Sequence, residues 1–205
     1  MEFQDVLRRR RMVRNFDSRP LARDVVERIV ANGLRAPSAG FTQGWAFLVL
    51  EGTEETSRFW SATFASAEAR AGFRWQGLFN APLLIVALSH KDAYLDRYAE
   101  DDKGWADRSE DRWPVPYWYV DTGMASLLIL QTAVDEGLGA CFFGIPGEHT
   151  DGFRAAFGIP ADHVPVGAIT VGHRLADSGA KGSPARRGRR TNLVHRGRWG
   201  TTVGV

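Results

Sequence analysis

The protein is a chain of 205 residues, 44% of them hydrophobic and 11% aromatic, with 26 basic and 24 acidic side chains. This length and composition suit a globular protein with a sizeable core and argue against wholesale disorder. Basic side chains gather in two short segments, residues 8–14 and 181–198, whereas a protein that binds a long polyanion usually spreads them over one face. We therefore expect the two segments to converge on one small anion.

The sequence offers no membrane or metal signal. It contains no run of 18 apolar residues, and its first residues lack the apolar stretch of a signal peptide. Cys141 is the single cysteine, which excludes an internal disulfide, and the five histidines follow no paired metal-binding spacing. We expect a soluble cytoplasmic protein that binds no metal, no membrane and no nucleic acid.

The first half of the chain alternates between helix and strand patterns. Apolar residues at every third or fourth position predict helices, and short apolar runs rich in β-branched residues predict strands. In chain order these elements are a helix over 2–9, a helix over 24–34, a strand over 46–52, a frayed helix over 54–77 and a strand over 82–90. The last of them is apolar almost throughout, which is typical of a strand buried on both faces.

The second half opens with an acidic, tryptophan-rich stretch over 98–118, in which Pro114 and Pro116 prevent a helix. We expect a long loop there, and long loops often carry function. The elements that follow are a core helix over 119–139, a strand over 139–145, a short helix over 150–157, a strand over 164–174 and an extended tail from Leu175. Without an internal repeat or a clear linker, residues 1–205 are predicted to form a single α+β domain.

Two glycine-containing segments are candidates for contact with a ligand. GLGACFFG at 137–144 follows a helix and opens a strand, which reverses the order of a dinucleotide-binding fingerprint. Gly137 is therefore predicted to end the helix, and Cys141 to be a buried, inert thiol. Small residues at 37–40 predict a tight loop whose backbone can approach a ligand closely. Taken alone, an ordinary helix-to-strand connector is the simpler interpretation of that loop.

Five motifs in a particular order carry a resemblance. They are RRMVRNF at 10–16, APSAGFTQGW at 36–45, the Gly-Leu-Gly end of the long helix at 137–139, the strand end VGH at 171–173, and Arg189-Arg190 before a Val-His…Trp ending at 194–199. With these motifs the chain resembles the flavin-dependent nitroreductase family over essentially its whole length.

The resemblance implies an α+β three-layer sandwich, in which helices flank a central, mostly antiparallel sheet. It also implies an interlocked homodimer with FMN at the subunit interface and NAD(P)H as the reductant. The cofactor-binding positions that it implies are Arg10, Arg11, Met12 and Arg14 near the phosphate and ribityl chain, Pro37, Ser38, Ala39 and Gly40 along the ring, Phe142, Phe143 and Gly144 behind the ring, and Arg189 or Arg190 at the phosphate.

Arginine suits the phosphate end of such a cofactor. A phosphate monoester carries nearly two negative charges at neutral pH, and the guanidinium fork binds its oxygens in a bidentate manner. Neighbouring residues of a helix point about 100° apart, so four consecutive arginines cannot all face one phosphate. Arg8 and Arg9 are therefore predicted to be surface or dimer-contact residues.

Three residues depart from the family pattern. Met12 stands where the family has serine, Phe41 where it has asparagine, and Gly44 where it has proline. A phenyl ring at position 41 could line or narrow a pocket for an apolar or aromatic substrate. The substrate-binding residues predicted on this basis are Phe41, Trp113, Tyr117 and Trp118, with core packing as the alternative for Trp118.

The function implied is the reduction of nitroaromatic, quinone or similar conjugated acceptors by NAD(P)H in a ping-pong cycle. The flavin performs the chemistry in such enzymes, so no catalytic side chain is predicted. Two alternatives stay open. One is an FMN-binding protein without NAD(P)H-driven turnover, or with a specialised flavin reaction such as dehalogenation or desaturation. The other is a polyanion-binding module that uses both basic ends.

Overall fold

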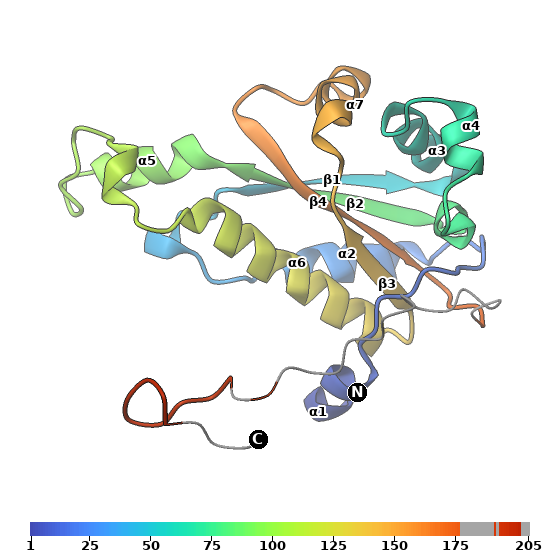
Figure 1. Ribbon diagram of the computed structural model, residues 1–205, viewed down its shortest axis with the longest axis horizontal. Coiled ribbons are helices and arrows are strands. Elements are labelled where there is room, and N and C mark those ends of the chain that lie inside the picture. Colours follow the sequence, from blue (N-terminus) through green and yellow to red (C-terminus); the bar gives the residue numbers. More distant parts are fainter. Residues whose placement is uncertain (177–190, 192, 202–205) are drawn as a thin grey trace.

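A four-stranded antiparallel sheet forms the centre of the computed structural model, which describes residues 1–176, 191 and 193–201. The strand order is β1-β2-β4-β3, with β1 (Trp45–Glu51), β2 (Leu83–His90), β3 (Gly139–Phe143) and β4 (His163–Gly172). Helices α2 (Arg23–Gly33) and α6 (Tyr117–Asp135) cover one face, and α3 (Gly52–Ala62), α4 (Ala67–Ala71) and α7 (Thr150–Phe157) lie towards the other (Figure 1). The expected α+β sandwich is confirmed.

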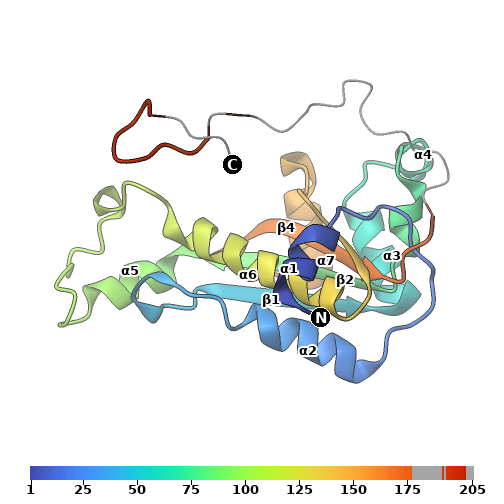
Figure 2. The ribbon, with the colours of Figure 1, turned by 90° about the horizontal axis from the view of Figure 1, so that it is seen from below.

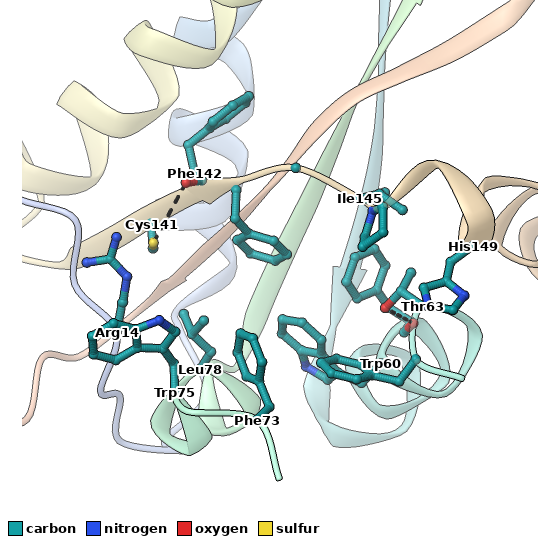
Figure 3. A pocket seen from close by; sticks show the side chains of 15 residues that line it. Arg14, Trp60, Thr63, Phe73, Trp75, Leu78, Cys141, Phe142, Ile145 and His149 are labelled. Atoms are coloured by element: carbon teal, nitrogen blue, oxygen red, sulfur yellow. Dashed lines mark hydrogen bonds between the residues drawn. The ribbon is translucent and has the colours of Figure 1, made fainter. Parts of the chain in front are cut away.

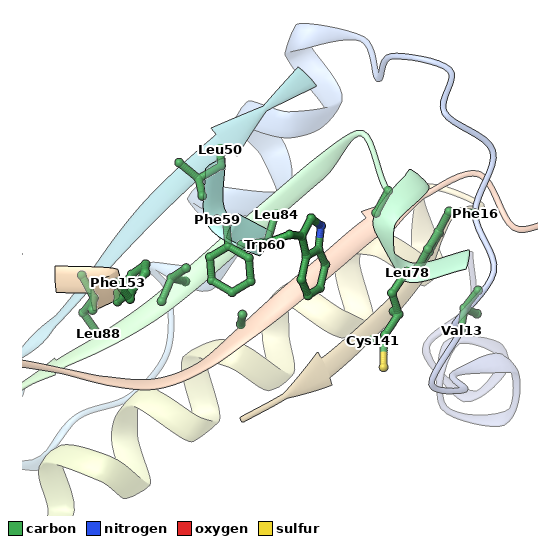
Figure 4. Packing of buried hydrophobic residues seen from close by; sticks show 13 residues of the cluster. Val13, Phe16, Leu50, Phe59, Trp60, Leu78, Leu84, Leu88, Cys141 and Phe153 are labelled. Carbon is green, nitrogen blue, oxygen red and sulfur yellow. The ribbon is translucent and has the colours of Figure 1, made fainter. Parts of the chain in front are cut away.

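Each face of the sheet carries its own hydrophobic cluster, because successive side chains of a strand point to opposite faces. On β2, Leu84 and Val86 face α3 and α7, whereas Leu83 and Ile85 face α2 and α6. All four side chains are at most 1% exposed, which confirms a strand buried on both faces. Figure 4 shows Leu84 in the first cluster together with rings from α3 and α7.

Helix α6 begins directly after Pro116. Proline has no backbone N–H group, and it is tolerated there because the first N–H groups of a helix have no partner within the helix. It ends before Gly137, whose φ of 74° lies in the left-handed region that glycine adopts without strain. The predicted role of Gly137 as the residue that ends the helix is thereby confirmed.

Two predicted segments differ from the structure. The helix expected over 54–77 is broken, because Ser66 accepts the N–H of Ala69 at 3.1 Å and starts the separate helix α4, which η2 (Gln76–Asn80) follows. The stretch expected as a loop from 98 begins inside α5 (Lys91–Ala99), which was not predicted because its apolar side is short. One turn, η3 (Glu110–Arg112), interrupts the remainder of that stretch.

The N-terminal segment is helical only at its start. Helix α1 (Phe3–Arg9) packs beside α6 (Figure 2), and the chain then runs extended along β3. The N–H of Val13 donates to the carbonyl of Ala140 at 2.9 Å, and Met12 forms a parallel bridge to the same residue. The helical-spacing argument therefore does not apply beyond Arg9, because neighbouring side chains of an extended segment point to opposite sides.

Candidate functional site

A cavity of about 340 Å³ opens between β3, the extended N-terminal segment, helix α3 and the stretch over residues 73–78 that follows α4 (Figure 3). Most of its wall is aromatic or aliphatic, and the guanidinium of Arg14 stands at one end. The residues that line it are Arg14, Phe59, Trp60, Thr63, Phe64, Phe73, Trp75, Leu78, Cys141, Phe142, Phe143, Gly144, Ile145, Pro146 and His149.

Arg14 is the charged group of this cavity. Its guanidinium lies 5.0 Å above the ring of Trp75, and its Nη1 donates to the carbonyl of Met12 at 3.3 Å. Arg14 forms no ion pair with any residue that the structure describes. The positive charge is therefore free to meet an anion, while the indole holds the guanidinium in place.

The neighbouring arginines divide between two sides of the extended segment. Arg11 and Val13 line a groove with Arg8, Arg9 and Arg174, away from the aromatic cavity. Arg8 pairs with Asp5, and Arg9 contacts the sulfur of Met1, so both are surface residues, as expected.

Arg10 is the residue that caps α1, and it lines neither this groove nor the aromatic cavity. Of the three arginines predicted for the phosphate, Arg14 alone lines the cavity. The roles of Arg10 and Arg11 stay predictions. Arg189 and Arg190 lie outside the described residues.

Met12 carries a thioether where the family pattern has a hydroxyl, and it lies beside β3. Its sulfur accepts the N–H of Phe142 at 3.4 Å. A thioether is a weak acceptor and cannot donate a hydrogen bond. The Met12 side chain therefore takes up the N–H of Phe142 and has no hydrogen bond to donate to a ligand.

The end of β3 contributes one ring and one open stretch of backbone. Phe143 lines the cavity and stacks on Trp60, with ring centroids 5.4 Å apart and planes 15° apart. Phe142 points the other way, against Gly167, and offers the cavity only its backbone. A Cβ atom added at Gly144 would meet nothing within 4 Å, so a planar group can approach this backbone.

Cys141 is buried beside these residues, as the sequence predicted. Burial raises the pKa of the Cys141 thiol, and the nearby Arg14 opposes this shift only in part. The thiol is neutral at physiological pH and is unsuited to act as a nucleophile.

The predicted ligand loop at 37–40 forms a second centre, held by side chains that the sequence did not single out. The carboxylate of Asp121, buried on α6, accepts the N–H of Ala39 at 2.8 Å and the hydroxyl of Tyr94 at 2.9 Å. Arg97 donates to the carbonyl of Gly40 at 3.1 Å. An acid near the start of a mostly apolar helix was the signal for Asp121, because a buried carboxylate needs partners.

Gly44, one of the three departures, has a steric reason. A Cβ atom at this position would lie 2.3 Å from the ring of Tyr94 and 2.9 Å from the carbonyl of His90. Burial raises the pKa of the Tyr94 hydroxyl, and its hydrogen bond to Asp121 adds to the shift. The ring that holds Asp121 therefore takes the space that a larger residue at position 44 would need.

The four predicted substrate residues lie around this second centre with different exposures. Phe41 is 76% exposed at the loop tip and has a left-handed φ of 55°. Trp118 is only 4% exposed, so it packs in the core. Trp113 lies half-buried among aromatic rings, 4.6 Å from that of Tyr98, and Tyr117 is 40% exposed.

The two centres do not meet within one chain. No residue between 36 and 45 lines the cavity of Arg14. Figure 1 places α5, which packs on the 39–41 turn, at one end of the sheet, and α3 and α4 at the other. The predicted cofactor positions thus form two separated groups.

Comparison with known proteins decides the family, because a model described as "Nitroreductase family" matches residues 7–173. The chain belongs to the nitroreductase family. It is 24% identical over 184 residues to a "Putative NADH dehydrogenase/NAD(P)H nitroreductase" of Methanothermobacter thermautotrophicus, covering 88% of this chain and 82% of the relative. A protein of the same name from Archaeoglobus fulgidus is 27% identical over 167 residues, which are 80% of each chain.

Solved structures of nitroreductases share the fold. One from Exiguobacterium sibiricum 255-15, a "putative nitroreductase in complex with FMN", superposes with a TM-score of 0.65 at 22% identity, covering 92% of this chain and 94% of that one. This nitroreductase-family protein is accordingly an oxidoreductase enzyme of the flavin type, as the resemblance implied. Among the described helices, none has the length and apolarity needed to cross a membrane.

Proposed function

We propose that this nitroreductase-family protein binds FMN and uses NAD(P)H to reduce nitroaromatic, quinone or similar conjugated acceptors in a ping-pong cycle. The observation that carries the proposal is the cavity that joins the guanidinium of Arg14, which pairs with no acid in the described part of the chain, to an aromatic wall and to the open backbone at Gly144. A planar, apolar ring with a phosphate at one end fits such a cavity in both shape and charge.

Arg14 would hold the phosphate from within the cavity, and Arg10, which the family resemblance assigns to the same group, would assist it. Each hydrogen bond to a charged group contributes about 1.5–3 kcal/mol, so two guanidiniums are sufficient for firm retention. Phe143 and Trp60 would bound the ring, and the backbone at Gly144 would lie against it. Bound FMN would supply the hydride-accepting and electron-donating chemistry.

We infer that a second copy of the chain completes the site. Val120, Gly123 and Leu127 recur on one side of α6 at spacings of three and four, and all three are exposed. Phe3 and Leu7 on the neighbouring helix α1 are 60% and 42% exposed. Exposed apolar surface of this kind is typical of an interface between subunits. A partner covering it would supply its own 37–41 loop to the cavity.

The chain's own residues would orient the reactants and exclude water. NAD(P)H and the acceptor would occupy one place in turn, above the ring and beneath the partner's loop. No side chain of the cavity is needed as an acid or base, since a proton can come from water. Cys141, with its raised pKa, stays neutral throughout.

The second candidate is a flavin-binding protein without NAD(P)H-driven turnover, or one with a specialised flavin reaction. Phe41 favours this candidate, because its exposed phenyl ring, on a left-handed backbone at the loop tip, could block a nicotinamide from the face of the flavin ring. In that case Phe41→Ala should open the site to NADH or NADPH, and the unaltered protein should resist both.

Anaerobic absorbance spectroscopy separates these functions. Protein purified with FMN should be yellow, NADH or NADPH should bleach the flavin band, and a quinone or nitroaromatic compound should restore it. Yellow protein that both nucleotides leave oxidised would select the second candidate. Protein that retains no FMN after gel filtration would overturn both.

A further inference from the structure

Two histidines and one aspartate meet at the end of the sheet where β2 stops and β4 starts. His90 is the last residue of β2 and His163 the first of β4, and the two face each other directly in the antiparallel pair. Asp162 immediately precedes His163. The imidazole rings are stacked, with centroids 4.5 Å apart and planes 22° apart.

The donor atoms of these three side chains converge. Nε2 of His90 lies 3.4 Å from one carboxylate oxygen of Asp162, and Nδ1 of His163 lies 2.8 Å from the other. All three donors lie within 4.8 Å of one another. Ligands about 2.1 Å from a tetrahedral zinc ion lie about 3.4 Å apart, so small ring rotations bring the set to coordination distance.

The backbone beneath the cluster is held by hydrogen bonds. The N–H of His90 donates to the carbonyl of Gly44 at 2.9 Å. Arg154 donates to the carbonyls of Pro160 and His163, each at 2.5 Å, and so fixes the turn that carries Asp162. The histidine side chains are 28% and 22% exposed and that of Asp162 is 44% exposed, which leaves an approach from solvent.

The geometry points to a binding site for one divalent transition-metal ion of the zinc type, held by His90, Asp162 and His163 with a fourth position open to water. Two imidazole nitrogens and one carboxylate oxygen are ligands that zinc accepts. The site is separate from the cavity of Arg14, since none of its three ligands lines that cavity.

The bound ion would tie the end of β2 to the start of β4, and through the His90–Gly44 hydrogen bond it would steady the chain next to the 37–41 loop. The charge of Arg154 beside the same turn works against a cation, so we expect micromolar rather than nanomolar affinity. This inference does not depend on flavin binding.

The test uses tag-free, full-length protein freed of metal with a chelator and then titrated with Zn²⁺ by calorimetry. One ion per chain should bind, and Asp162→Asn, His90→Gln and His163→Gln should each weaken binding at least tenfold. His195→Gln removes a histidine outside the cluster and is the matched control. In thermal melts, Zn²⁺ should raise the midpoint of the unaltered protein and leave that of Asp162→Asn unchanged.

Asp162 is exposed, so its substitution by asparagine should leave the metal-free fold intact, which circular dichroism can check. Failure of the unaltered protein to bind Zn²⁺ would overturn the inference. So would equal loss of binding in His195→Gln, or full binding by a folded Asp162→Asn protein. Any of these results would leave Asp162 only as a hydrogen-bond partner of His163 that lies close to His90.

Discussion

Met12 is the departure from the family pattern that lies nearest in sequence to the arginines proposed to bind the phosphate. The thioether accepts the N–H of Phe142 at 3.4 Å and cannot donate a hydrogen bond. Met12→Ser would restore a hydroxyl donor on the side of the segment that carries Arg14.

We expect Met12→Ser to tighten FMN binding about tenfold, since one hydrogen bond to a charged group contributes about 1.5–3 kcal/mol. Fluorescence titration of flavin-free protein with FMN measures the change. Met12→Ala, which shortens the side chain without adding a donor, is the control. Equal affinities of the serine and alanine variants would show that the hydroxyl contributes nothing.

The residue allowed at position 44 is also set by a neighbouring side chain, the ring of Tyr94. Because a Cβ atom there would lie 2.3 Å from the ring of Tyr94, Gly44→Ala should displace the ring that holds Asp121. Overpacking of this kind costs about 1–3 kcal/mol, which urea unfolding should report as a lower midpoint at an unchanged slope. Gly147→Ala, at a position with nothing within 4 Å, should leave the midpoint nearly unchanged. A Gly44→Ala midpoint equal to that of the unaltered protein would contradict the packing described.

At the scale of elements, hydrophobic periodicity was sufficient to predict a helix or strand wherever that element has a long apolar side. The four strands and the helices α1, α2, α6 and α7 were predicted to within a few residues for this reason. Helix α5 was missed because its buried residues, Tyr94 and Leu95, are too few to set a period. The break after α3 depends on the side chain of Ser66, which competes with the helix for backbone N–H groups.

Helix α5 and the 37–41 loop behave as one unit, because Arg97 bonds both the carbonyl of Gly40 and the carboxylate of Asp102. Arg97→Met should release the loop, and hydrogen exchange over residues 38–44 should become faster. Arg112→Met removes a comparable ion pair with Asp107 that does not contact the loop, so its exchange there should match the unaltered protein. Unchanged exchange in Arg97→Met would mean that Arg97 does not hold the loop.

At the scale of the whole molecule, the sequence supplied the parts of the site but not their arrangement. The 37–40 segment and the segment around Arg14 were both singled out from residues near in sequence, yet the fold places them at separate centres. His90 and His163 show the converse, since strand pairing joins residues too far apart in the chain for any spacing rule. Only the fold, and under our dimer proposal a second copy, decides which residues meet.

The dimer proposal predicts the effect of a charge on the exposed side of α6. Leu127→Asp should give monomers in sedimentation experiments and lower the FMN content, because a buried charge without a partner destabilises an interface. Val164→Asp places the same charge at an exposed apolar position on β4 and should leave the dimer intact. A dimeric, yellow Leu127→Asp protein would show that the interface lies elsewhere.

The FMN content of purified protein tests the central claim most directly. We predict about one FMN per chain for the unaltered protein, since one Arg14 cavity serves each subunit. The double variant Arg10→Ala with Arg14→Ala should be a largely colourless dimer, while Arg8→Ala with Arg9→Ala should stay yellow. Stoichiometric FMN in the first double variant, or an equal loss in the second, would contradict the assignment of the phosphate to Arg10 and Arg14.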